Sequence, residues 1–212
     1  MVSKLILIGG GGHCHACIDV IESTNRYEII GIIDTKEKQN QLVLGYPIIG
    51  NDNDLALLVQ RNIWFLITIG HISTPNPRQK LFEKLCSLGA NIATIISPYA
   101  LISRHSTVGL GTIIMHKAVI SAGSVIGDNS IINTNADIEH DSIIRNHVHV
   151  STHAVVNGNC LIDDGVFIGS NSTLLQGVCI TKNTVIGAGS VVTKDVNNSG
   201  VYYGNPAKSR NE

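Results

Sequence analysis

The sequence is poor in aromatic residues and in charge. Of its 212 residues, 4% are Phe, Trp or Tyr and 15% are charged, and the formal net charge is −1. A chain so close to neutrality presents no basic surface for nucleic acid or for anionic membranes. No apolar run approaches the roughly 20 residues that a helix needs to cross a bilayer. These shortages exclude both classes of partner, and we expect neither nucleic acid nor membrane.

Signals for secretion and for disulfides are also scarce. The chain has five cysteines, an odd number. Its opening apolar stretch is too short for a secretory signal peptide and has no small-residue cleavage site. The pair Cys14 and Cys17 forms a C-x-x-C without a second pair for a zinc site, and it falls at an expected helix start, where buried thiols pack well. We therefore expect a cytoplasmic protein with free cysteines.

What the sequence has in abundance is a repeat of six. From position 102 to 192 every sixth residue, here called an anchor, is Ile, Val or Leu, sixteen times without interruption. Four residues after each anchor, up to position 190, stands Ser, Thr, Ala, Cys or Val. Helices (period 3.6) and alternating strands (period 2) do not maintain such a period. A triangular solenoid does, because each hexad supplies one short strand and one corner, and three hexads complete a turn of about 18 residues. We predict a left-handed parallel β-helix, whose narrow interior also suits the shortage of aromatic rings.

The first 97 residues predict a separate small domain. Apolar runs alternate with helical patterns in the order 4–8, 16–23, 28–33, 54–60, 64–69, 77–88 and 91–96. This alternation is typical of a parallel α/β sheet. The predicted fold class is therefore α/β plus all-β, with a Rossmann-like domain at residues 1–97 and a β-helix domain with a C-terminal tail at residues 98–212.

The strand ends of the first domain predict a site for a nucleotide diphosphate. Four glycines, Gly9 to Gly12, follow the first apolar run and let the backbone approach a phosphate, whose charge the next helix N-terminus favours. Asp34, at the end of the second run, is placed to hydrogen-bond a ribose or a base. Position 14 is Cys, where the dinucleotide pattern G-x-G-x-x-G requires Gly. We favour a nucleotide diphosphate within a substrate, with a redox cofactor or a plain tight turn as alternatives.

Four histidines crowd the middle of the repeat. His140 follows an anchor by two residues, which places it at a prism vertex, and Gly158 lies one coil above it. His149 is half a turn further round, so the two histidines of one chain face different sides. They share a site only where a second subunit brings its face to this vertex, which predicts a homotrimer with three interfacial sites. His147 and His153 are expected to be solvated side chains at coil corners.

Several of these segments resemble a known family. Gly9 to His13, Ile33-Asp34-Thr35, Ile138-Glu139-His140-Asp141, His147-Val148-His149-Val150-Ser151 and the closing Gly204-Asn205-Pro206-Ala207-Lys208 are similar to the nucleotide-amino-sugar N-acetyltransferases of the PglD/NeuD type. These belong to the left-handed β-helix (hexapeptide repeat) acyltransferases. The resemblance covers nearly the entire chain, and the pairing of the two domains makes it specific. It implies acetyl transfer from acetyl-CoA to the C4 amino group of a UDP- or dTDP-linked 4-amino-4,6-dideoxyhexose, in the biosynthesis of surface glycan or glycoprotein sugars.

The resemblance also implies roles for individual residues. His140 matches the catalytic base, Asp141 a carboxylate that orients it, and Gly158 a backbone N–H donor to the thioester oxygen. The matches to acetyl-CoA contacts are His149, Ser170 and Ala188, and those to nucleotide-sugar contacts are Gly11, Gly12, His13, Asp34, Thr35 and Gly70. Asp141 stands where the PglD branch usually has Glu, and Thr35 departs from the acidic residue of some members, which leaves the nucleobase open. A histidine suits the proton transfer, because its ordinary pKa lies near neutrality.

Three other functions compete with this one. O-acetylation of a sialic-acid-type sugar, as in the NeuD branch, would not need the nucleotide-diphosphate pocket in the same way. A zinc-dependent hydratase of the γ-carbonic-anhydrase type would use the clustered histidines as ligands, although the α/β domain has no role in that reaction. A non-catalytic trimerisation scaffold would leave the His140-Asp141 pair without a purpose. We expect acetyl-CoA as cosubstrate and no metal.

Overall fold

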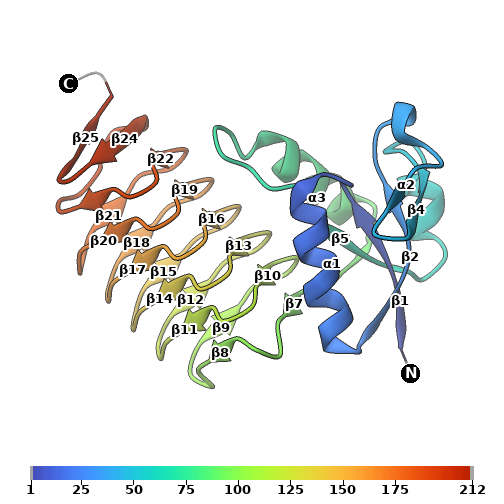
Figure 1. Ribbon diagram of the computed structural model, residues 1–212, viewed down its shortest axis with the longest axis horizontal. Coiled ribbons are helices and arrows are strands. Elements are labelled where there is room, and N and C mark those ends of the chain that lie inside the picture. Colours follow the sequence, from blue (N-terminus) through green and yellow to red (C-terminus); the bar gives the residue numbers. More distant parts are fainter. Residues whose placement is uncertain (1, 211–212) are drawn as a thin grey trace.

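A six-stranded sheet with helices on both sides forms the N-terminal domain in the computed structural model, which describes residues 2–210 (Figure 1). Its strands are β1 (Ser3–Ile8), β2 (Tyr27–Ile33), β3 (Leu42–Val43), β4 (Tyr46–Gly50), β5 (Trp64–Ile67) and β6 (Asn91–Ile92). Their spatial order is β3-β4-β2-β1-β5-β6, and only β3 and β4 pair antiparallel. The predicted α/β domain is confirmed.

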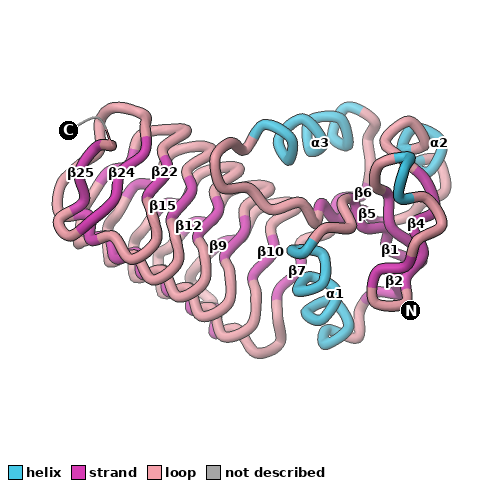
Figure 2. The backbone as a smooth tube through the Cα atoms, turned by 45° about the horizontal axis from the view of Figure 1, so that its top comes forward, coloured by secondary structure: helices cyan, strands magenta, loops and turns pink. Residues whose placement is uncertain are grey.

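The helices of this domain cover opposite faces of the sheet. They are α1 (Gly12–Thr24), the 3-10 helix η1 (Lys36–Lys38), α2 (Leu55–Val59) and α3 (Asn76–Ser87). Alternation along β1 sends Leu5 and Leu7 toward α1 and Ile6 and Ile8 toward α3. Figure 2 shows these two helices on either side of β5. The parallel strands therefore end together at one edge, where ligands bind in such sheets.

The rest of the chain is the predicted β-helix, with three flat faces of stacked two-residue strands. Face 1 comprises β7 (Ile95–Ile96), β10 (Ile113–Ile114), β13 (Ile131–Ile132), β16 (His149–Val150), β19 (Phe167–Ile168) and β22 (Val185–Ile186). Face 2 comprises β8 (Leu101–Ile102), β11 (Val119–Ile120), β14 (Asp137–Ile138), β17 (Val155–Val156), β20 (Thr173–Leu174) and β23 (Val191–Val192). Face 3 comprises β9 (Thr107–Val108), β12 (Val125–Ile126), β15 (Ile143–Ile144), β18 (Leu161–Ile162) and β21 (Cys179–Ile180).

The period of six has the physical origin that the sequence indicated. Each anchor is the second residue of its strand and pairs with the anchor 18 positions on, as Ile114 does with Ile132. Anchors from Ile114 onward are at most 2% exposed. Most of the small residues beside the corners are buried as well, and most of the polar ones bond to the backbone. Ser142 Oγ, for example, donates to the Asn157 carbonyl at 2.8 Å, whereas the buried hydroxyl of Thr184 has no partner among residues 2–210.

The expected strand over residues 91–96 is wrong as a single element. Its first half, β6, pairs with β5, whereas its second half, β7, pairs with β10 and begins face 1 of the coil. The strand is interrupted because the chain crosses from one sheet to the other at Ala93 and Thr94. The hairpin formed by β3 and β4 was not expected at all.

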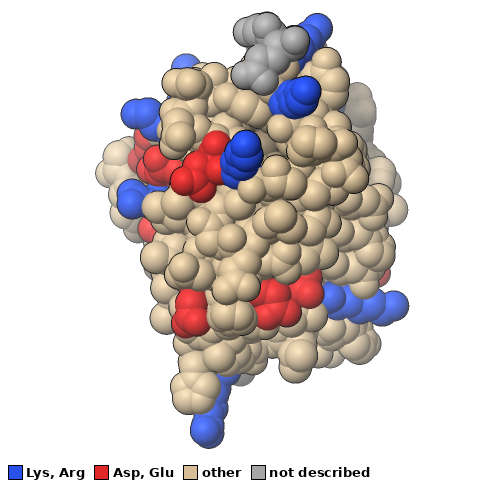
Figure 3. Space-filling model, turned by 90° about the vertical axis from the view of Figure 1, so that its left-hand side faces the viewer, with Lys and Arg blue, Asp and Glu red and all other residues tan. Residues whose placement is uncertain are grey.

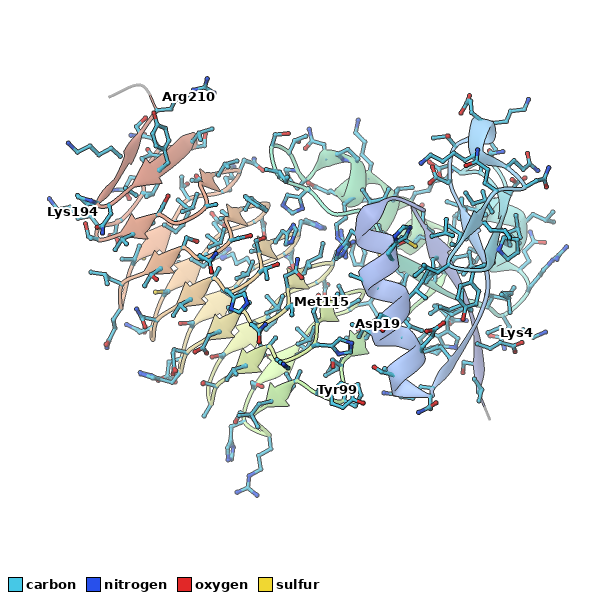
Figure 4. All side chains as sticks on the ribbon, in the orientation of Figure 1. Lys4, Asp19, Tyr99, Met115, Lys194 and Arg210 are labelled. Atoms are coloured by element: carbon cyan, nitrogen blue, oxygen red, sulfur yellow. The ribbon has the colours of Figure 1, made fainter. Side chains whose placement is uncertain are left out.

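The two domains share one buried junction. Ile95, Ile113 and Ile131 of face 1 pack into the same apolar cluster as Cys17 and Ile21 of α1. Asp19 of α1 also bonds to Nε2 of His116 at 3.0 Å across the junction. Figure 4 shows Asp19 beside Met115 of the coil. The cleft of the α/β domain is thereby held in a fixed position over face 1.

A fully buried arginine joins the same two parts. The Arg78 guanidinium donates to the Ile67, Ile69 and Asn129 carbonyls at 2.6–3.0 Å, and to that of Gly111 at 3.3 Å. The first two carbonyls lie at the end of β5 and the other two in coil turns. Arg78 therefore fixes the loop after β5 against the coil.

A hairpin closes the far end of the coil. β24 (Val201–Gly204) pairs parallel with β22, and β25 (Ala207–Ser209) returns antiparallel to it. In the view onto this end, the charged side chains lie in an upper group and a lower row, with an uncharged band between them (Figure 3). The hairpin covers the last coil and extends face 1 by two strands.

Candidate active site

A cleft of about 810 Å³ opens where the strand ends of the α/β domain meet face 1 of the coil. Five of the six residues predicted to contact a nucleotide sugar line it, namely Gly11, Gly12, His13, Asp34 and Gly70. The sixth, Thr35, lines a smaller adjoining pocket of about 260 Å³ together with residues 51–53. Gly9, Asp34 and Ile69 border both. The two pockets therefore form one trough along the edge of the sheet.

The glycine loop leaves this trough open. A Cβ added at Gly11 or Gly12 would meet no atom of the surrounding residues within 4 Å, so both positions of the cleft lining face open space. The N-terminus of α1 has no side-chain cap and no acidic residue in its first turn. Its backbone N–H groups and the helix dipole are available to an anion.

Asp34 holds this loop in shape. Its Oδ2 accepts from the Gly10 N–H at 2.8 Å and from Lys38 Nζ at 3.0 Å, and its Oδ1 accepts from the Thr35 N–H at 2.7 Å. Burial raises the pKa of Asp34, but these hydrogen bonds outweigh it and hold the pKa below its ordinary value. Both carboxylate oxygens thus have protein partners. In this structure Asp34 holds the glycine loop in place, and the hydrogen bond to a ribose or base that the sequence predicted would be an additional contact.

Three imidazoles gather where the cleft meets the coil. The ring centroid of His149 lies 6.1 Å from that of His13 and 5.5 Å from that of His71. Burial lowers the pKa of His13 and of His71 to about 3, and that of His149 to about 4. All three rings are therefore neutral near pH 7 and act as hydrogen-bonding groups without charge.

The tautomer of His149 follows from its partners. Its Nδ1 donates to the His71 carbonyl at 2.8 Å, and its Nε2 accepts from the Asn133 amide at 3.3 Å. Both ring nitrogens are thus engaged within the chain. His149 belongs to the wall of the cleft on face 1, beside the residues expected to bind the nucleotide sugar.

His140 lies on a different part of the molecule, at the vertex between faces 2 and 3. Its Nδ1 lies 3.0 Å from Asp141 Oδ2, and both side chains are more than half exposed. Because the carboxylate accepts from Nδ1–H, the lone pair of Nε2 is free to accept a proton. Nε2 lies over Gly158, where an added Cβ would come within 2.5 Å of it. Within residues 2–210, the Gly158 N–H has no hydrogen-bond partner.

Two of the three candidate acetyl-CoA residues, Ser170 and Ala188, occupy a third location, whereas the other, His149, lines the cleft. Ser170 and Ala188 are stacked one coil apart at the vertex between faces 1 and 2, as their spacing predicted. Ser170 Oγ shares a hydrogen bond of 2.9 Å with Ser151 Oγ. One chain therefore brings neither the candidate base nor the stacked pair of Ser170 and Ala188 to the cleft, although it does bring His149 there.

The sequence missed some residues of the cleft and misjudged another. His71 and Asn133 line the cleft but were not singled out. A histidine directly after Gly70, at the end of an expected strand, was the available signal for the first. His147 was expected to be a solvated side chain, which is wrong, since it packs on Phe82 at 5.7 Å and bonds to Asn129 at 2.9 Å. The reason is that α3 covers this corner.

Two further features bear on the competing functions. Among residues 2–210, no group of three or more His, Cys, Asp or Glu side chains has the geometry to hold a metal ion. The part of the chain that the structure describes also contains no helix long and apolar enough to cross a membrane. Cys14, Cys17 and Cys160 are buried free thiols.

Known proteins share this arrangement. The PglD N-terminal domain family matches residues 4–85, and the bacterial transferase hexapeptide family (six repeats) matches residues 159–194. The acetyltransferase domain of PglB from Neisseria gonorrhoeae FA1090, solved in complex with acetyl coenzyme A, is 30% identical with a TM-score of 0.92, covering 99% of this chain and 100% of that one. No curated protein sequence matches the chain significantly.

A second solved relative carries both ligands. PerB from Caulobacter crescentus, in complex with CoA and GDP-perosamine, is 30% identical with a TM-score of 0.90, covering 99% of this chain and 98% of that one. A histidine-to-asparagine mutant of perosamine N-acetyltransferase from the same organism, with the same two ligands, is 29% identical with a TM-score of 0.92, covering 100% of this chain and 99% of that one.

Proposed function

The chain belongs to the PglD-type sugar N-acetyltransferases of the left-handed β-helix superfamily, and on this premise we propose how its cleft and its coil divide the reaction. It is an acetyl-CoA-dependent enzyme that acetylates the C4 amine of a nucleotide-linked 4-amino-4,6-dideoxyhexose. In this proposal residues 1–97 bind the nucleotide sugar and residues 98–212 bind acetyl-CoA. The reaction serves surface glycan or glycoprotein sugar synthesis in the cytoplasm.

The trough gives each part of the nucleotide sugar a place. The nucleobase occupies the smaller pocket beside Thr35, and the diphosphate lies over the glycine loop at the N-terminus of α1. Lys38, which is 44% exposed, is the cationic side chain on the lining of the cleft. The hexose then lies at the coil end, near His13 and Asn133. This order directs the C4 amine away from the sheet and toward the rim of face 1.

His140 is the base in this proposal. The neutral amine attacks the thioester carbonyl, the C–S bond breaks, and CoA leaves as a thiolate, which becomes the thiol when the protonated His140 passes on the proton that it has taken from the amine. The amine proton passes to Nε2 of His140, whose Nδ1–H is held by Asp141. The free N–H of Gly158 lies directly below that ring and donates to the oxyanion that forms on the carbonyl. No covalent acyl-enzyme is required.

The separation of these groups on one chain supports a homotrimer. If face 2 turns toward a threefold axis, the vertex of one subunit that carries Ser170 and Ala188 meets the vertex of the next that carries His140 and Gly158. Face 2 is suited to this, because four of its six outward strand residues are apolar, namely Leu101, Val119, Val155 and Val191, with Asp137 and Thr173 between them, and Leu101 is 69% exposed. Acetyl-CoA then lies between the subunits, beside the cleft.

The observation that carries the proposal is the pairing of an open trough at the sheet edge with the His140-Asp141-Gly158 group on the coil. The test is release of CoA thiol from acetyl-CoA with GDP-, UDP- and dTDP-linked 4-amino-4,6-dideoxyhexoses. We expect turnover with at least one of them and an amide at C4 in the product. Release of CoA only with a sialic-acid-type acceptor that carries no nucleotide diphosphate would contradict it.

A further inference from the structure

The geometry points to His71, together with His13, as the group that binds hydroxyl groups of the hexose ring, an assignment that rests on the proposed function. His71 follows the loop glycine Gly70 and lines the cleft at its coil end. It is the side chain there whose hydrogen-bonding capacity the chain itself leaves unused.

His71 is buried and unpaired at once. His71 is only 6% exposed, yet neither of its ring nitrogens has a hydrogen-bond partner among residues 2–210. Nε2 of the neighbouring His13 is equally buried and unpaired. The Val166 carbonyl lies near the ring and acts to raise the pKa of His71, but its contact with the ring falls short of hydrogen-bond geometry. A buried polar atom without a partner is costly, so a ligand that supplies the missing partners is the simplest explanation of this arrangement.

The packing of His71 fixes where its ring points. Its backbone carbonyl accepts from Nδ1 of His149, and its ring meets those of His149 and Phe167 edge-on, at 5.5 Å and 6.3 Å. Arg78 holds the carbonyl of Ile69, two residues before it, at 3.0 Å. The imidazole is thus held in the wall of the cleft by the rings and the backbone around it.

The chemistry of the ring selects the partner. Burial, with help from His149 and Arg78, lowers the pKa of His71, so the ring is neutral, with one N–H donor and one acceptor nitrogen. A phosphate offers acceptors only and is better served by the α1 N-terminus and Lys38. A hydroxyl both donates and accepts, and two hydroxyls on one ring match a donor and an acceptor. His71 therefore fits the hexose and not the diphosphate.

The test compares His71→Phe with wild type by calorimetry. Phenylalanine preserves an aromatic ring in the wall and removes both nitrogens. Each titration compares a nucleotide sugar with its free nucleoside diphosphate. The three pairs are GDP-perosamine and GDP, a UDP-linked 4-amino-4,6-dideoxyhexose and UDP, and a dTDP-linked 4-amino-4,6-dideoxyhexose and dTDP. We expect the variant to bind the nucleotide sugar about 30-fold more weakly, as two lost neutral hydrogen bonds imply. Its affinity for the free diphosphate should be unchanged. The matched control is His15→Phe, because His15 is an exposed histidine on α1 outside the cleft, and it should bind every ligand as wild type does.

A second measurement needs no variant. In wild-type protein with ¹⁵N-labelled histidine, the ring signals of His71 should shift on addition of the nucleotide sugar and stay in place on addition of the diphosphate. The assignment is overturned if His71→Phe binds the nucleotide sugar as tightly as wild type does and the His71 signals do not move. In that case, CoA release by the wild-type protein still supports the proposed function. Absence of CoA release from wild type with all three sugars contradicts the proposed function, and the assignment then falls with it.

Discussion

Replacing Gly158 with alanine tests the position of the base without touching the base itself. The new Cβ would lie 2.5 Å from Nε2 and 2.6 Å from Cε1 of His140, far inside van der Waals contact. The obstructing atoms belong to a side chain that is 54% exposed. The ring of His140 therefore swings outward while the backbone of the coil stays where it is.

We expect Gly158→Ala to lower kcat without lowering the stability of the protein. Restoring ordinary contact requires the ring to move by about 1 Å, and misplacement of a reacting group by that distance costs about 10²-fold in rate. The movement also strains the 3.0 Å bond between Nδ1 and Asp141. Complete loss of a general base costs about 10²–10⁴-fold, which sets the upper limit. Stability should hold or rise slightly, because alanine restricts the unfolded chain more than glycine does.

The assay measures kcat from CoA-thiol release, together with the melting temperature of each variant. Gly200→Ala is the matched control, because a Cβ there meets only Tyr202 at an ordinary 3.6 Å. We expect kcat to fall for Gly158→Ala and to remain at the wild-type value for Gly200→Ala, with both proteins melting near wild type. Unchanged kcat in Gly158→Ala would refute the role of the His140 ring, and a large fall in melting temperature would refute the claim that the ring yields freely.

Three other predictions use the same assays. His140→Ala should lower kcat by about 10²–10⁴-fold. Because the residue lies at an exposed vertex, the proposed trimer should remain intact in light scattering. Turnover near the wild-type value would show that another residue is the base. Gly12→Val should raise KM for the nucleotide sugar and leave KM for acetyl-CoA unaltered, because the added side chain occupies open space in the lining of the cleft. An equal rise in both KM values would show that the nucleotide sugar does not bind to the α/β domain as proposed. The depressed pKa values of His13, His71 and His149 mean that the unfolded chain binds more protons below pH 6.5, so the free energy of unfolding should fall by about 2 kcal/mol per histidine between pH 7.5 and pH 5. Urea denaturation with the same midpoint at both pH values would contradict that burial.

The coil was predictable because one physical requirement repeats in it. Every hexad needs an apolar residue inside the prism and a small one beside the corner. The sixteen hexads therefore repeat the same sequence signal sixteen times. The α/β domain follows from its alternating runs for a similar reason. β3 and β7 are only two residues long, as the other coil strands are, but β3 belongs to no repeat and β7 directly continues the apolar run that begins in the α/β domain. Which sheet such a strand joins depends on the tertiary contacts at the junction.

The candidate site was predictable where its chemistry lies close in sequence. His140 and Asp141 are neighbours, and Gly158 is one coil away, so periodicity alone places them together. The wall of the cleft was not, because His71 comes from the α/β domain and Asn133 from the coil. His147 was misjudged for the same reason, since the ring that covers it, Phe82, lies 65 positions earlier in the chain. Contacts between the domains carry no signature in either segment.

Mixing two defective subunits tests most directly the claim that one reaction site is shared between chains. Subunits with His140→Ala keep an intact cleft, and subunits with Gly12→Val keep an intact base, so a mixed trimer contains sites that draw both intact halves from different chains. With random 1:1 assembly and a nucleotide-sugar concentration below KM, about a quarter of the sites combine the two intact halves, and we predict recovery of about a quarter of the wild-type rate of CoA release. Mixed trimers with no more activity than the average of the two separate variants would show that each chain works alone and would contradict the account.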